Sequence, residues 1–144
     1  MEFTVTVEMT QPLAEVFDYL TDPRQRPEWQ ASLRSVKLLD EGEPRLGMHW
    51  RETTMIGISP EMEITGWESN KSWSEKGQWA GVTGHLHLIF LATDNGTRVT
   101  AKVHIDASGP WTLVAWPAGK LGPTAIRSDL DRASRILTER AASK

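Results

Sequence analysis

The chain contains no cysteine. This absence excludes disulfide bonds, thiolate nucleophiles and zinc sites built from cysteines. No apolar run approaches the roughly eighteen residues that a membrane-spanning helix needs, so we expect no stable membrane insertion. The first ten residues also lack the basic start and apolar run of a signal peptide. A cytoplasmic protein is therefore the expectation.

The motifs that mark common enzyme classes are also missing. The sequence shows no Ser/His/Asp arrangement, phosphate-binding loop, dinucleotide fingerprint or His/carboxylate metal run. We therefore expect no cofactor and no metal site. The net charge is −3, and the six basic side chains of residues 120–144 are interspersed with three acidic ones. Nucleic-acid binding usually shows a dense basic patch, so we expect no nucleic-acid partner.

What the sequence does contain fits one globular domain over residues 1–144. Hydrophobic residues make up 39% and charged residues 24%, and a chain of 144 residues can bury a real core. Seven tryptophans stand against one tyrosine and three phenylalanines. Tryptophan has a large apolar ring and one N–H donor, so it suits the wall or rim of a cavity. Ordinary core or surface packing is the alternative for each single tryptophan.

A long amphipathic helix is predicted between Ser108 and about Arg140. Its apolar residues recur at spacings of four, three and four, which places on one helical face Ile126, Leu130, Ala133 and Leu137. Such a helix needs a broad apolar surface to cover its stripe. Pro117 and Pro123 predict a kinked front segment that lies over the mouth of a cavity. A lid or membrane-facing role for this segment is the alternative.

The rest of the chain alternates apolar and polar residues with the period of two that indicates strands. The first strand runs from Phe3 to Met9, and two short helices follow it. Pro12 opens the first helix, Asp22 caps the second, and Trp29 lies near its end. Six further strands are predicted at 33–40, 48–56, 61–68, 71–79, about 84–92 and 97–105. Short connections favour an antiparallel meander, hence an α+β domain.

Turn signals set the strand registers. Asp94-Asn95-Gly96 is a strong hairpin signal, and pairing Ala92 with Thr97 puts the apolar side chains of both strands on the inner face. The same register directs outward three histidines, which we expect to be solvated and without metal: His85, His87 and His104. A two-residue turn at Ser69-Asn70 would place Glu75 opposite Ile64.

Two carboxylates are the candidates for catalysis. Glu52 shares a strand face with Trp50, Thr54 and Ile56, and Glu75 is predicted to face Ile64. A carboxyl group in an apolar cavity has a raised pKa and can act as an acid or base near neutral pH. The alternative is that the registers slip by one residue, or that these groups pair with neighbours such as Arg51.

Several short motifs resemble those of the START-related helix-grip superfamily (SRPBCC), in particular its polyketide cyclase/dehydrase-like branch. They are Val16-Phe17-Asp18-Tyr19-Leu20-Thr21-Asp22-Pro23, Pro27-Glu28-Trp29, Gly47, Gly96-Thr97-Arg98-Val99-Thr100 and Ser108-Gly109-Pro110. The resemblance covers nearly the whole chain. It implies a helix-grip fold: a curved antiparallel sheet of about seven strands wrapped around a long C-terminal helix, with two short helices after the first strand. It also implies a deep cavity between sheet and helix.

Three functions are compatible with this architecture. The first is binding of a small apolar or aromatic molecule, lipid- or polyketide-like, by a monomer or homodimer. The expected ligand-binding residues are Trp29, Trp50, Glu52, Met62, Ile64, Trp73, Leu86, Leu88, Val103 and Trp111. The second is a cyclase or dehydratase, which a buried, titrating Glu52 would favour. The third is a protein-interaction module resembling activators of the Hsp90 ATPase, which a solid core and an exposed apolar patch would favour.

Overall fold

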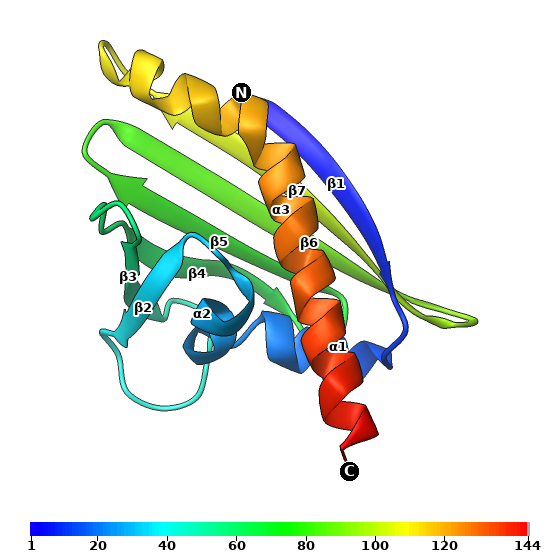
Figure 1. Cartoon of the computed structure of the whole chain (residues 1–144). Helices are drawn as coiled ribbons and strands as arrows, with labels where there is room; N and C mark the ends of the chain where they lie inside the picture. Colours follow the sequence, from blue (N-terminus) through cyan, green and yellow to red (C-terminus); the bar gives the residue numbers. More distant parts are fainter. Residues whose placement is uncertain (144) are drawn as a thin grey trace.

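The computed structural model describes residues 1–143 as a curved sheet crossed by one long helix (Figure 1). Seven antiparallel strands pair in the order β1-β7-β6-β5-β4-β3-β2. The elements are β1 (Glu2–Met9), α1 (Leu13–Leu20), the 3-10 turn η1 (Pro23–Gln25), α2 (Arg26–Trp29), β2 (Leu33–Leu38), β3 (His49–Thr54), β4 (Glu61–Glu68), β5 (Ser72–Trp79), β6 (Val82–Thr93), β7 (Gly96–Ala107) and α3 (Trp111–Ala142). The predicted α+β helix-grip fold is confirmed.

The predicted helical stripe packs on the inner face of the sheet. Leu130, Ala133 and Leu137 are buried, and Ile126 packs against the same core at its edge. Alternation in β1 supplies part of the opposing surface, because Val5 and Val7 are buried while Thr6 between them is exposed. Burying one leucine of this kind contributes about 1.5–3 kcal/mol. The stripe therefore holds α3 against the sheet.

The front of α3 bends away from the direction of the rest of the helix, as Figure 1 shows where the ribbon passes from yellow to orange. Pro117 and Pro123 lie inside the helix, and each removes a backbone donor and crowds the preceding turn. The bent front reaches β1 closely, since a Cβ on Gly122 would lie 2.6 Å from the Phe3 ring. The kink predicted from the two prolines is thus present.

The hairpin register predicted at the β6–β7 turn is confirmed. Ala92 pairs with Thr97, and the pairing continues through Leu88 and Ala101 to His85 and His104. The side chains of Leu86 and Leu88 therefore share the inner face of the sheet.

Two local expectations were wrong. Glu68 pairs with Ser72, so the β4–β5 turn holds three residues, not two. A bulge in β4 between Ile64 and Gly66 absorbs the extra residue, and Glu75 pairs with Ile64 as predicted. The third predicted strand was also too long. β3 ends at Thr54, and Ile56 lies in the following turn with 82% of its surface exposed.

A candidate ligand cavity with a buried ion triad

A cavity of about 480 Å³ lies between the inner face of the sheet and α3. Its lining is mostly apolar, with Leu86, Leu88 and Val103 from the sheet and Val114, Ile126 and Leu130 from α3. Small-molecule sites typically occupy roughly 300–1,000 Å³ and are lined in this way. The space is therefore large enough for an organic ligand.

Two paired glycines help to leave this space open. Gly77 of β5 pairs with Gly84 of β6, and both line the cavity. A Cβ added at Gly84 would have no neighbouring atom within 4 Å, whereas one at Gly77 would meet the Met62 sulfur at 2.6 Å. A side chain placed at position 84 would thus extend into free volume without displacing its neighbours.

The polar part of the cavity begins on α2. This helix is a single turn that follows η1, where Asp22 Oδ1 accepts a hydrogen bond of 3.0 Å from the Arg24 N–H. Residues three apart lie on one helical face, so Arg26 and Trp29 both point inward and are buried. The Arg26 guanidinium lies 5.6 Å from the Trp29 ring centroid and 5.5 Å from that of Trp50. Both rings therefore make cation–π contacts with the guanidinium.

Arg26 contacts both candidate carboxylates. Its Nη2 donates to Glu75 Oε1 at 2.6 Å and its Nη1 to Glu75 Oε2 at 2.8 Å, which is a two-pronged ion pair. The same Nη1 also donates to Glu52 Oε2 at a longer 3.3 Å. The alternative that these carboxylates face outward or pair with Arg51 is thereby excluded. The three residues Arg26, Glu52 and Glu75 are called the buried triad below.

Two tryptophans complete the hydrogen bonding of the triad. Each precedes its glutamate by two residues on the same strand, so both side chains share one face. Trp50 Nε1 donates to Glu52 Oε2 at 3.0 Å, and Trp73 Nε1 donates to Glu75 Oε1 at 3.4 Å. These indole N–H groups orient the carboxyl groups beneath the cavity.

The triad carries two acids and one base in surroundings that exclude water. Arg26, Glu52 and Glu75 are only 3%, 4% and 2% exposed. Burial alone lowers the pKa of Arg26, but Glu75 and Glu52 together raise it above its ordinary value, so the guanidinium stays charged. Burial raises the pKa of Glu52, and the Glu75 charge adds to this, against the lowering by Arg26. Glu52 therefore keeps its proton at higher pH than an exposed glutamate does.

Unpaired donors also lie in this region. Arg26 Nε and Trp29 Nε1 are buried and have no hydrogen-bond partner within residues 1–143. An unsatisfied buried donor costs free energy, on the order of 1–3 kcal/mol. Both residues line the cavity. Of the three buried side-chain atoms without a partner in the described residues, the two that belong to cavity-lining residues are donors; the third, Gln11 Oε1, belongs to a residue that does not line the cavity.

The ten expected ligand-binding residues fall into three groups. Trp50, Ile64 and Trp73 are fully buried in the core. Trp111 packs edge-on against Trp79 at 5.5 Å between ring centroids, and of these two rings Trp79 lines the cavity. The remaining six residues line the cavity themselves: Trp29, Glu52, Met62, Leu86, Leu88 and Val103.

Arg26 was not among the residues singled out from the sequence. Two inward carboxylates imply a nearby cation, and the spacing of three between Arg26 and Trp29 could have suggested it. The sequence signal was weak, because a one-turn helix has too few residues to show a buried stripe.

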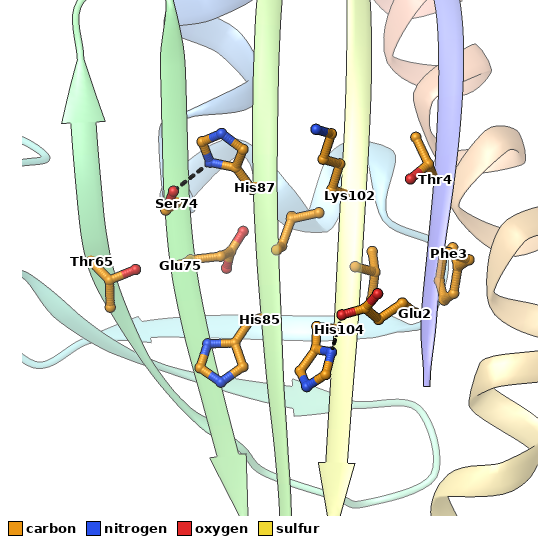
Figure 2. A pocket seen from close by; sticks show the side chains of 12 residues that line it. Glu2, Phe3, Thr4, Thr65, Ser74, Glu75, His85, His87, Lys102 and His104 are labelled. Carbon is orange, nitrogen blue, oxygen red and sulfur yellow. Dashed lines mark hydrogen bonds and ion pairs between the residues drawn. The ribbon is translucent and has the colours of Figure 1, made fainter.

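The three histidines lie on the opposite, outer face of the sheet, as predicted (Figure 2). There Ser74 Oγ and His87 Nδ1 are 2.6 Å apart, and His104 contacts Glu2 at 2.9 Å and Asp106 at 2.8 Å. No three His, Asp or Glu side chains within residues 1–143 are grouped so that they could hold one metal ion. The three histidines line a second pocket, of about 350 Å³, together with Lys102 and Thr4.

None of the helices in residues 1–143 combines the length and apolar character that a membrane crossing requires.

A family model described as "Polyketide cyclase / dehydrase and lipid transport" matches residues 1–142. The chain belongs to this family. The resemblance found in the sequence motifs is confirmed, and membership indicates small hydrophobic ligands in general. No curated protein matches the chain.

Solved structures agree with the fold of this family. A conserved protein from Geobacillus kaustophilus superposes with a TM-score of 0.76 at 14% identity, covering 96% of each chain. A protein from Mesorhizobium loti gives 0.75 at 17% identity, covering 96% of this chain and 98% of the other. A protein from Mycobacterium smegmatis gives 0.69 at 21% identity, covering 96% and 92%. At such identities the likeness establishes the fold alone.

Proposed function

We propose that this chain acts as a single ligand-binding domain that holds a small, largely apolar molecule, lipid- or polyketide-like, in the cavity beneath α3. The observation that carries the proposal is the apolar cavity of about 480 Å³ with one polar cluster, the buried triad. Such a site uses apolar walls for affinity and a few polar groups for orientation. Membership of a lipid-transport family supports the same class of ligand.

A second function is favoured by Glu52. A carboxylic acid held in an apolar site near a fixed guanidinium can donate its proton to a carbonyl or hydroxyl oxygen of a bound molecule. In an acid-assisted cyclisation such a proton activates a carbonyl for attack, and in an acid-assisted dehydration it lets a hydroxyl leave as water. The burial of Glu52 and its raised pKa are what this enzymatic function requires. The third possibility, an interaction module with a solid core, has less support because the core contains the cavity.

Ligand binding is testable by filling the cavity. A thermal-shift screen of fatty acids, sterols, flavonoids and aromatic polyketides should yield a class that stabilises the wild type. A ligand at about a hundred times its Kd adds roughly 2.7 kcal/mol, which for a domain of this size raises Tm by about 5–10 °C. Gly84→Leu should abolish the shift, because the new side chain occupies the cavity.

The matched control is Thr83→Leu, the neighbouring residue of β6, which does not line the cavity. It should keep the wild-type response. A screen in which no apolar compound gives a saturable shift, or in which Gly84→Leu responds like the wild type, would refute cavity binding.

A further inference from the structure

The two carboxylates of the buried triad are bonded unequally. Both oxygens of Glu75 accept from Arg26, at 2.6 and 2.8 Å. From Arg26, Glu52 receives only a 3.3 Å contact, and it comes from an Nη1 atom that Glu75 already uses. One guanidinium balances one carboxylate, so Glu75 and Arg26 form the ion pair. A second carboxylate without its own cation in an apolar site neutralises itself by taking a proton.

The proton of Glu52 has a defined position. The hydrogen bonds from Arg26 Nη1 and Trp50 Nε1 both end on Oε2 of Glu52, at 3.3 and 3.0 Å. Oε2 is therefore the accepting oxygen, and the O–H belongs to Oε1. Glu52 lines the cavity, and we infer that a bound molecule meets its free oxygen, Oε1, because Oε2 is engaged by Arg26 and Trp50.

The neighbouring donors determine which functional group a bound molecule needs. Arg26 Nε and Trp29 Nε1 are buried without partners beside the same cavity. Together with the Glu52 O–H, they make a site that has donors to spare. An ammonium group would add more donors next to the Arg26 charge, and a ligand carboxylate would meet the Glu75 charge.

We propose that the cavity selects apolar molecules bearing a neutral carbonyl oxygen, such as a ketone, and that Glu52 recognises this oxygen as an uncharged carboxylic acid. This proposal rests on the proposed binding function and specifies its ligand class. Glu52 is then a specificity-determining residue, and selectivity for the carbonyl group depends on pH.

Other ionisable groups around the cavity do not replace Glu52 in this role. Arg26 of α2 and Glu75 of β5 are engaged with each other. Asp129 of α3 lines the cavity, and burial raises its pKa, but its Oδ1 accepts a hydrogen bond of 3.1 Å from the Ala31 N–H. His85 of β6 adjoins the cavity through its strand, while its ring lies on the outer face of the sheet (Figure 2).

The test compares three probes with the same apolar body. They are 2-acetylnaphthalene, 2-ethylnaphthalene and 1-(2-naphthyl)ethylamine, titrated calorimetrically into the wild-type protein across a range of pH. At low pH the ketone should bind roughly two- to tenfold more tightly than the hydrocarbon, the fold-change that corresponds to one net hydrogen bond. This preference should disappear as the pH rises through the titration of Glu52, because the carboxylate no longer donates.

Two variants isolate the proton of Glu52. In Glu52→Gln, the amide oxygen can accept from Trp50 and Arg26, which turns the NH₂ group to the cavity. This variant should keep the ketone preference and lose its pH dependence. Glu52→Met should bind the hydrocarbon as the wild type does and show no preference for the ketone. Glu8→Gln, a control at an exposed carboxylate of β1 that does not line the cavity, should retain both the preference and its pH dependence.

The outcomes separate this proposal from the binding function beneath it. If the hydrocarbon binds the wild type but not Gly84→Leu, the cavity is a binding site. The carbonyl proposal then fails if the ketone has no advantage at low pH, if Glu52→Met retains that advantage, or if the amine binds best. If none of the three probes binds at any pH, the apolar-binding function fails as well.

Discussion

The two faces of the central strands use polar residues in opposite ways. On the outer face, the side chains of Ser74 and His87 are half-buried and that of Lys102 is exposed, and all three line a pocket of about 350 Å³ (Figure 2). On the inner face of the same sheet, Glu75 and Glu52 lie beneath a cavity and are 2% and 4% exposed. Along β5, Ser74 and Glu75 are adjacent in sequence, but the side chain of Ser74 lies on the outer face of the sheet and that of Glu75 lies in the interior. The strand alternation, more than the residue type, decides which polar groups can be tuned for function.

The energetics of the two faces differ accordingly. Exposed pairs such as His104 with Glu2 are worth about 0–1 kcal/mol, because water screens them. Removing one member of a buried pair leaves a charge without water or partner. Substitutions on the inner side should therefore have large effects, and matched substitutions on solvent-exposed positions should have small ones.

The largest contrast is expected along α3. Leu130 is 1% exposed and packs against the sheet, whereas Leu121 on the same helix is 66% exposed. Leu130→Asp should lower the free energy of unfolding by about 4 kcal/mol or more, since it buries an unpaired charge. Leu121→Asp should stay within about 0.5 kcal/mol of the wild type. Urea unfolding measures both, and equal stability of the two variants would show that the helix does not pack as described.

Removal of the triad cation should come next. Arg26→Met leaves Glu75 and Glu52 buried without their cation and should cost about 3–5 kcal/mol near neutral pH. The outer-face control, Lys102→Met, also removes one positive charge but should cost less than about 0.5 kcal/mol. A loss below 1 kcal/mol for Arg26→Met would mean that water reaches the two carboxylates.

A smaller effect concerns pH and Glu52. Because the pKa of Glu52 is raised in the folded state, its protonated form contributes stability fully below about pH 4.3, the ordinary value. That contribution falls as pH rises through the folded-state pKa, by about 1.4 kcal/mol per unit of pKa difference. Glu52→Gln lacks this loss, so its stability relative to the wild type should increase with pH. Parallel stability profiles for the two proteins would contradict the raised pKa.

The smallest effect is expected at the outer histidines. Zinc or nickel should leave the Tm of the wild type unchanged, and the double substitution of His85 and His87 by alanine should not alter this result. Protein purified without added metal should contain none in stoichiometric amount. Bound metal that is lost in the double variant would show that the outer face is a metal site after all.

Most of the fold could be predicted because its signals are local. The Asp94-Asn95-Gly96 turn fixes the β6–β7 register, and that register places His85, His87 and Leu88 on their correct faces. The pairing of Glu75 with Ile64 was predicted correctly, although the prediction assumed the wrong length for the β4–β5 turn. The predicted turn was one residue too short, and the β4 bulge compensates for this. A bulge has no clear signal in the sequence at this point.

The candidate site could be predicted only in part. Glu52 was placed inward because it shares strand parity with Trp50. Arg26 was missed because its direction depends on how a one-turn helix docks against the sheet, which is a tertiary property. The open volume at Gly84 could not be inferred either, since a glycine in a strand can mark a bulge, a close approach or an empty space.

The protonation state of Glu52 tests the central claim, that the inner face holds an uncharged acid beneath an apolar cavity. Carbon-13 NMR of glutamate carboxyl groups follows this titration directly, with Glu52→Gln to assign the signal. The predicted result is a midpoint for Glu52 clearly above about 4.3, the ordinary glutamate value. Adding 2-acetylnaphthalene should shift this midpoint in the wild type and not in Gly84→Leu. A midpoint at or below the ordinary value would mean that Glu52 is ionised, and neither its role as a donor to ligands nor its role as an acid would stand.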